Sequence, residues 1–239
     1  MAYITCHDLS LGYDGRVIVS DLNFEVKKGD YLCVVGENGT GKSTLIRTLL
    51  RLQDAISGQI IAGDGLMPYE IGYLPQQTVV QKDFPATVWE IVLSGTLSRC
   101  GKRPFYGKEE KALAEEKIKK MGIWELRKKC YRTLSGGQQQ RTLLARALCA
   151  AGKVVLLDEP VTGLDPKVTA EFYRMIQELN GEGISVIMVS HDVQAVQYAT
   201  HILHIDRKDS FYGEKKAYLK SSKWKLFQRE EEADHERYD

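Results

Sequence analysis

The sequence Gly36-Glu37-Asn38-Gly39-Thr40-Gly41-Lys42-Ser43-Thr44 fits G-x-x-x-x-G-K-[ST], the pattern of a phosphate-binding loop. The apolar run 31–35 before it predicts a buried strand, and the apolar spacing of 44–50 after it predicts a helix. A strand, a glycine-rich turn and a helix N-terminus together direct several backbone N–H groups at one anion. We therefore expect this loop to bind nucleotide phosphates, with Lys42 reaching the β- and γ-phosphates and the Ser43 hydroxyl ligating Mg²⁺.

The composition of the 239-residue chain is that of an ordinary soluble protein, with 43% hydrophobic and 27% charged residues. Its 33 basic and 32 acidic residues nearly balance, so we expect no nucleic-acid partner. No apolar run approaches the roughly 20 residues that span a bilayer, and the N-terminus has none of the features of a signal peptide. We expect a cytoplasmic protein that would reach a membrane only by docking on another subunit.

The cysteines and histidines give no indication of a metal site. Five scattered cysteines without a C-x-x-C pair indicate reduced thiols, with neither a disulfide framework nor a zinc site. His201 and His204 form an H-x-x-H pair, but the apolar residues between and after them indicate a strand. Strand alternation would place the two rings on opposite faces, so we do not expect a shared metal.

Strand and helix patterns alternate along most of the chain. Strands are expected at 9–13, 17–19, 22–26, 57–63, 71–75, 154–157, 184–189 and 202–205, and helices at 44–50, 87–93, 109–121, 166–179 and 192–198. Strands that alternate with helices predict a largely parallel sheet covered on both faces. From about 88 to 150 the character is helical, with a basic loop at 99–107, which indicates an insertion into that core.

Two acidic residues follow one of the expected strands. The apolar run 154–157 leads into Asp158 and Glu159, and a buried strand can deliver carboxylates to the sheet edge at which the phosphate loop opens. We expect Asp158 to orient Mg²⁺ through water, and Glu159 to polarise the water that attacks the γ-phosphate. Two acids after a strand can also simply begin a loop. His191 and Gln76 follow other strands, and neither would be singled out alone.

A second anion-binding turn lies in Leu134-Ser135-Gly136-Gly137-Gln138, at the start of an apolar helix. The chain thus has two phosphate-binding helix starts, one in the sheet core and one in the helical insertion. The motifs follow the order phosphate loop, Gln76, 134–138, Asp158-Glu159, 163–165 and His191. From about Ile4 to Gly213, this order resembles that of the ATP-binding-cassette (ABC) ATPases.

The resemblance implies a fold and a domain organisation. It implies an α/β fold, namely a P-loop NTPase core with a mainly parallel sheet, an antiparallel β subdomain at about 1–30 and 56–75, and an inserted α-helical subdomain at about 84–150. A single ATPase domain would span 1–215. We expect the charged tail 216–239 to be a solvated helix or a frayed end.

The resemblance also implies a composite site, in which two copies of the chain face each other head to tail and hold ATP and Mg²⁺ between them. The implied nucleotide contacts are the whole phosphate loop, Tyr13 stacked on adenine, and Ser135, Gly136, Gly137 and Gln138 of the second copy. The implied catalytic residues are Lys42, Gln76, Glu159 and the switch residue His191, and the implied Mg²⁺ ligands are Ser43, Gln76 and Asp158.

The segment after Gln76 suggests which kind of ABC protein this is. Asp83-Phe84-Pro85-x-Thr87-Val88, followed by a helix, is similar to the ATPases of zinc and manganese importers, while importers of iron chelates and cobalamin share part of it. The implied partners are a membrane permease and, indirectly, an extracytoplasmic substrate-binding protein. The chain would then lie on the inner face of the membrane. The alternative from another class is a soluble ABC ATPase of iron–sulfur cluster assembly.

Overall fold

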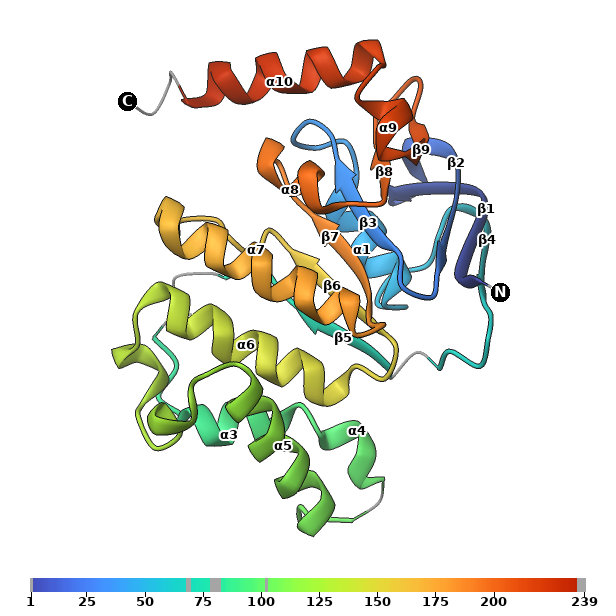
Figure 1. Cartoon of the computed structure of the whole chain (residues 1–239). Helices are drawn as coiled ribbons and strands as arrows, with labels where there is room; N and C mark the ends of the chain where they lie inside the picture. The colour runs from blue at the N-terminus through green and yellow to red at the C-terminus, as the bar shows by residue number, and fades with distance from the viewer. Residues whose placement is uncertain (1, 68–69, 78–82, 102, 236–239) are drawn as a thin grey trace. The chain divides into compact units, whose positions relative to one another are not determined.

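The computed structural model describes residues 2–67, 70–77, 83–101 and 103–235 (Figure 1). The chain divides into two compact units. Unit 1 comprises Met1–Pro68 and Asn180–Asp239, and unit 2 comprises Tyr69–Leu179. Within the described ranges, no helix combines the length and the apolar character needed to cross a membrane.

Unit 1 contains an antiparallel sheet with the strand order β2-β1-β4. Its strands are β1 (Ala2–Tyr13), β2 (Arg16–Lys27) and β4 (Ser57–Ala62). The two-residue turn between β1 and β2 consists of Asp14 and Gly15, both with positive φ angles, 49° and 76°, as the twist of a tight hairpin favours. The short strands predicted in the first thirty residues are therefore parts of two long ones.

Unit 1 also contains a mainly parallel set of strands in the order β7-β3-β8-β9. The strands are β3 (Tyr31–Val35), β7 (Ser185–Val189), β8 (His201–His204) and β9 (Phe211–Glu214), and only β9 runs antiparallel to its neighbour. Every residue of β3 and β7 is buried, as in parallel strands covered on both faces. Strand β8 lies one residue earlier than predicted, and β9 was not predicted.

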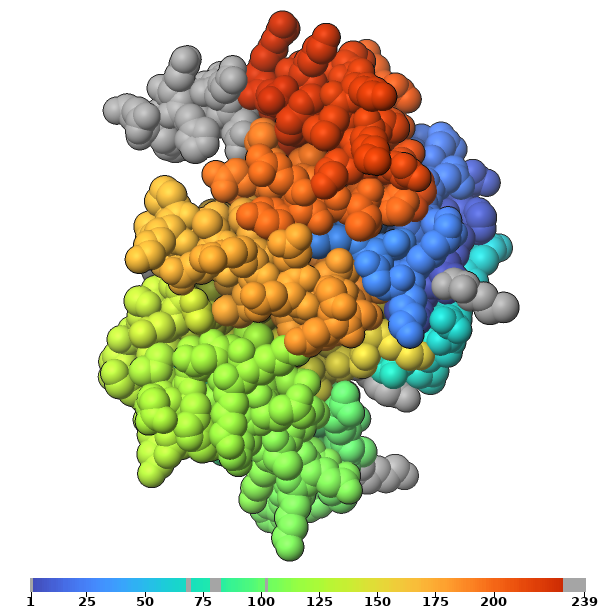
Figure 2. Space-filling model, in the orientation of Figure 1, coloured from blue at the N-terminus to red at the C-terminus, as the bar shows by residue number. Residues whose placement is uncertain are grey.

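Unit 1 also contains helices, two of which follow its last strand. They are α1 (Lys42–Leu49), α8 (Val193–Tyr198), α9 (Lys215–Tyr218) and α10 (Ser222–His235). Helix α9 packs on β8 and β9, and α10 packs on α8. The space-filling view shows the first turns of α10, in red, at the surface of unit 1 (Figure 2). The charged tail is helical in α9 and α10, but Tyr218 of α9 and Phe227 of α10 are buried.

Unit 2 is mostly helical. Its parallel strand pair is β5 (Ile71–Leu74) and β6 (Val154–Asp158), and its helices are α3 (Val88–Ser94), α4 (Leu97–Cys100), α5 (Lys108–Lys120), α6 (Gly136–Ala150) and α7 (Pro166–Gly181). Helices α3, α5 and α6 pack on one another, and α6 packs on β5 (Figure 1). The short α4 occupies the start of the segment predicted as the loop 99–107.

The start of α3 is a capping box between Thr87 and Glu90. The Thr87 side chain accepts a hydrogen bond from the Glu90 N–H at 3.2 Å, and the Glu90 carboxylate accepts one from the Thr87 N–H at 2.8 Å. This reciprocal capping satisfies two of the N–H groups that a helix start leaves unpaired. Taken together, the antiparallel sheet, the mainly parallel strands and the helical part confirm the predicted α/β class.

Candidate nucleotide-binding and catalytic site

The phosphate loop connects β3 to α1 in unit 1, as predicted. Its glycines Gly36, Gly39 and Gly41 have φ angles of 142°, 79° and 108°, which residues with side chains rarely adopt. A Cβ atom on Gly36 would lie 2.3 Å from the Ile205 carbonyl oxygen, so only glycine fits at the start of the loop. Helix α1 has no side-chain cap and no acidic residue in its first turn. Its N-terminal N–H groups and its dipole therefore suit an anion.

Lys42 lies inside this loop. Its side chain is only 6% exposed, and its Nζ donates hydrogen bonds to the carbonyl oxygens of Gly36 at 2.6 Å and of Glu37 at 2.8 Å. The Thr40 hydroxyl donates to the same Glu37 oxygen at 2.9 Å. The ammonium group is thus held by the loop that the sequence predicts to wrap the phosphates. The neighbouring Ser43 is exposed.

Tyr13 lies at the end of the β1–β2 hairpin and contacts α1. Its hydroxyl accepts hydrogen bonds from the Thr44 hydroxyl at 2.8 Å and from Arg47 Nη1 at 3.3 Å. The residue is still 41% exposed, so part of the ring is accessible to a ligand. Stacking of Tyr13 on adenine stays a prediction, and the two hydrogen bonds indicate that the residue also has a packing role.

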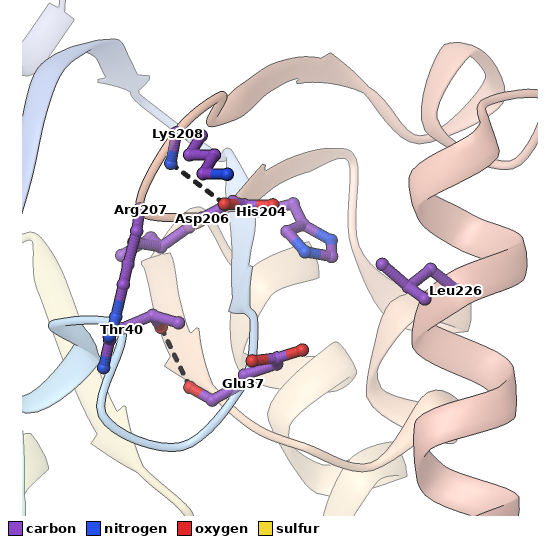
Figure 3. A pocket seen from close by; sticks show the side chains of 8 residues that line it. Glu37, Thr40, His204, Asp206, Arg207, Lys208 and Leu226 are labelled. Carbon is purple, nitrogen blue, oxygen red and sulfur yellow. Dashed lines mark hydrogen bonds between the residues drawn. The ribbon is translucent and has the colours of Figure 1, made fainter.

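A pocket of about 200 Å³ lies beside the phosphate loop (Figure 3). Glu37 and Thr40 line it from the loop, the segment 204–208 lines it from the end of β8 onward, and Leu226 lines it from α10. In Figure 3, the Arg207 side chain points from the segment toward Thr40 of the loop. No motif in the sequence pointed to the segment 204–208 or to α10 as neighbours of the loop.

His191 follows β7, which pairs in parallel with β3. Because both strands end at the same edge of the sheet, the structure brings His191 to the edge from which the phosphate loop leaves. The residues on either side hold its backbone: the Asp192 N–H donates to the Ser190 hydroxyl at 3.0 Å, and the Asp192 carboxylate caps α8 by accepting from the Gln194 N–H at 2.7 Å. The His191 side chain is exposed.

In unit 2, the predicted catalytic carboxylate contacts the predicted glutamine. Gln76 follows β5 and Glu159 follows β6, its parallel neighbour, and Gln76 Nε2 donates to the Glu159 carboxylate at 3.0 Å. The Thr162 hydroxyl donates to the same carboxylate oxygen at 3.3 Å, a contact that sequence reasoning missed. Glu159 has a φ angle of 45°, in the left-handed region that costs a non-glycine residue free energy. Such strain is common at functional sites.

Asp158 lies one residue earlier, at the end of β6. It is 9% exposed, and its carboxylate accepts a hydrogen bond from the Tyr73 hydroxyl at 3.3 Å. A buried carboxylate needs such a donor, or a cation, to offset the loss of hydration. Its oxygen atoms are of the kind that Mg²⁺ prefers, so the residue type fits the predicted role.

The signature segment forms the N-terminus of α6. The Ser135 hydroxyl accepts a hydrogen bond from the Gln138 N–H at 3.4 Å, and the Gln138 side chain accepts one from the Ser135 N–H at 3.1 Å. A Cβ atom on Gly137 would lie 2.6 Å from Cγ1 of Val168 in α7. The signature therefore has a structural role, a capping box with close helix packing, in addition to the anion-binding turn that the sequence predicted.

A second pocket, of about 350 Å³, lies within unit 2, and we call it the Phe84 pocket. Apolar side chains line much of it, among them Phe84, Ile91 and Leu143, and Glu90 and Arg146 add opposite charges. The segment 78–82, part of the loop that resembles metal importers, lies outside the described residues.

Tyr131 forms one wall of the Phe84 pocket and links three segments. Its hydroxyl accepts a hydrogen bond from Gln77 Nε2 at 2.5 Å, its N–H donates to the Ala86 carbonyl at 2.8 Å, and its carbonyl accepts from Gln139 Nε2 at 3.1 Å. Burial raises the pKa of its phenol well above the ordinary value. Tyr131 therefore connects the residue after Gln76 to the signature helix. Sequence reasoning missed it, because one tyrosine before a glycine turn carries no signal.

Comparisons with known proteins agree with these motifs. Residues 19–162 match the family model described as ABC transporter. The manganese transport system ATP-binding protein MntB of Bacillus subtilis is 36% identical over 195 residues, 80% of this chain and 77% of the relative. The zinc transport system ATP-binding protein AdcC of Streptococcus pneumoniae is 37% identical over 220 residues, 87% of this chain and 91% of the relative.

Solved structures of ABC transporters resemble the fold of this chain. A chain from a transporter assigned to the metal-chelate ABC type, in an inward-facing conformation, superposes with a TM-score of 0.86 at 28% identity. The match covers 96% of this chain and 90% of the other.

Proposed function

This chain belongs to the ABC transporter family as its ATP-binding subunit, an ATPase, and on that premise we propose that it drives the import of zinc or manganese. The observation that carries the proposal is the identity of 36–37% to relatives named for manganese and zinc transport. That these relatives are transport proteins favours import over iron–sulfur cluster assembly. A chelated metal is the second candidate substrate, because the chain is also similar to a solved structure of the metal-chelate type.

The Phe84 pocket supports docking of a separate membrane permease. Phe84 is 56% exposed beside a largely apolar pocket, a combination that suits an inserted helix or loop of a partner. Because the transported metal would not touch the ATPase, the choice of substrate belongs to the permease. The hydrogen bonds of Tyr131 to Gln77 and Gln139 offer a route by which permease contact would reach the signature helix.

For ATP hydrolysis, we assign separate roles to the residues of the two units. The phosphate loop and Lys42 bind the β- and γ-phosphates, and Glu159 orients the attacking water and accepts its proton. Gln76 holds the Glu159 carboxylate by a hydrogen bond. His191, at the edge of the sheet, acts as the switch residue. Mg²⁺, which would neutralise phosphate charge, suits the oxygen ligands Ser43, Gln76 and Asp158. A second copy, head to tail, supplies Ser135 to Gln138 to the γ-phosphate.

Metal uptake in cells that lack this chain tests the proposal. Cells would be complemented with wild type, Glu159→Gln or Phe84→Ala, and the accumulation of radioactive zinc, manganese and a ferric chelate compared. We expect zinc or manganese uptake with wild type only. Phe84→Ala should keep the ATPase rate of the purified chain while losing uptake, because the pocket serves docking and not hydrolysis. Restoration of ferric-chelate uptake alone would replace the metal assignment with the second candidate.

A further inference from the structure

The C-terminal helices α9 and α10 pack on the segment 204–208, which lies beside the phosphate loop. We propose that these helices position the loop for ATP binding, and that Phe227 and Lys223 are the positioning residues. The proposal rests on the contacts of unit 1 and on the ATPase activity of the family. It does not depend on which substrate is transported.

The segment 204–208 lies close to the loop at two points. At the start of the loop, the Ile205 N–H donates to the Val35 carbonyl at 2.8 Å, and the Ile205 carbonyl lies where a Cβ on Gly36 would clash at 2.3 Å. Further along, Arg207 Nη2 lies 3.8 Å from the position of a Cβ on Gly39. A shift of this segment would therefore change the path of the loop that holds Lys42.

The aromatic side chains of α9 and α10 hold the other side of the segment. His204 is buried, and its Nδ1 forms a 2.8 Å hydrogen bond with the Tyr218 hydroxyl. The Phe227 ring meets the His204 ring edge to face, with centroids 6.2 Å apart, and Trp224 contacts both Tyr218 and Phe227. Tyr218 and Phe227 are 0% and 3% exposed, so these contacts form a small core of their own.

Charged groups attach α10 to the same segment. Lys223 Nζ lies 3.7 Å from the Asp206 carboxylate and 3.3 Å from the Asp209 carboxylate, and it also donates to the Asp209 carbonyl. The Lys223 side chain is 17% exposed and that of Asp206 38%, so water screens this pair less than a fully exposed one. Asp209 is 83% exposed, so water screens its charge more strongly. Aromatic packing and ion pairs thus hold the segment between α10 and the loop. Figure 3 shows the pocket at this place, lined by His204 and Asp206 of the segment, by Glu37 and Thr40 of the loop and by Leu226 of α10.

The test measures ATP affinity separately from turnover in the full-length chain. In Phe227→Ala, the His204 ring loses its packing partner, and we expect the equilibrium Kd and the KM for ATP to rise on the order of tenfold, within the range of coupling through packed networks. The kcat at saturating ATP and the binding stoichiometry should stay at wild-type values. Phe227→Leu, which keeps apolar volume, should restore most of the affinity. The matched control is Leu219→Ala, because Leu219 directly follows α9 but is 41% exposed.

Lys223→Gln keeps the test decisive if Phe227→Ala fails to fold. It removes the charge that meets Asp206 and Asp209 while retaining the aromatic core, and we expect a Kd for ATP raised roughly threefold. The proposal is overturned if a folded Phe227→Ala or Lys223→Gln binds ATP with wild-type Kd. It is also overturned if the variants lower only the binding stoichiometry or kcat, since that result means lost folded protein rather than a displaced loop.

Discussion

Gln76 Nε2 donates a hydrogen bond to the Glu159 carboxylate at 3.0 Å, although the two residues are 83 positions apart in the sequence. They meet because the parallel strands β5 and β6 end side by side. Glu159, with its strained φ of 45°, is thus oriented by the residue that begins the segment leading to the Phe84 pocket. Any movement of that segment would shift Gln76 and with it the Glu159 carboxylate, to which we assign water activation.

Replacing Glu159 with glutamine tests that assignment. The amide keeps the shape of the carboxylate but cannot accept a proton, so we expect ATP hydrolysis to fall by about 10²- to 10⁴-fold while ATP still binds. In gel filtration with ATP, the variant should elute as a trapped dimer. Phosphate release measures the rate, and Glu178→Gln, an exposed change in α7, is the control. Normal turnover by Glu159→Gln would remove this residue from the chemistry.

Replacing Lys42 with alanine tests the phosphate loop. The change deletes a buried ammonium group, and hydrogen bonds to charged groups are typically worth about 1.5–3 kcal/mol. We therefore expect the Kd for ATP to rise roughly 10- to 100-fold, as titration calorimetry would measure it. Lys28→Ala, in the exposed turn before β3, should bind like wild type. Equal ATP affinity in the two variants would contradict the loop assignment.

Gly137→Ala tests whether the signature glycine has a packing role. The new methyl group would meet Val168 Cγ1 at 2.6 Å, and we expect the free energy of unfolding to fall by about 1–3 kcal/mol, the usual cost of overpacking. Combining it with Val168→Ala should recover part of that loss. Urea denaturation provides the measurement. If Gly137→Ala is as stable as wild type, the glycine serves only the anion-binding turn.

His204 makes the stability of the chain depend on pH. Burial lowers its pKa from 6.5 to about 4, with further lowering by Lys223 and Lys42 and partial opposition from Asp206 and Glu37. Between these two pKa values the unfolded chain binds the proton and the folded chain does not. The free energy of unfolding therefore contains the full contribution of neutral His204 above pH 6.5. It loses that contribution, about 3 kcal/mol at most, as the pH falls toward 4.

Denaturation curves at several pH values between 4 and 7 would measure this slope. In His204→Gln the group that titrates is absent, so the free energy of unfolding should depend less steeply on pH than in wild type. Identical slopes in the two proteins would show that other groups cause the acid sensitivity.

The parts of the fold that could be predicted from the sequence are those with a local signal. The phosphate loop and the apolar strand before Asp158 each carry their pattern within ten residues, so both could be read directly. The positions of Tyr218 and Phe227 could not be predicted, because they lie among charged residues and are buried only by contact with β8 and its neighbours. Strand β9 was missed for the same reason, since its pairing partner defines it more than its own composition does.

The Ser135 hydroxyl accepts the N–H of Gln138 as the cap of α6. A hydroxyl that accepts a hydrogen bond through a lone pair retains its own proton for donation. The Ser135 oxygen can therefore cap the N-terminus of α6 and donate a hydrogen bond to a phosphate at the same time. Alanine at this position would lose both abilities, whereas aspartate would keep the cap and repel the phosphate. Comparing the two substitutions would separate the contribution of Ser135 to its own subunit from its contribution to a neighbour.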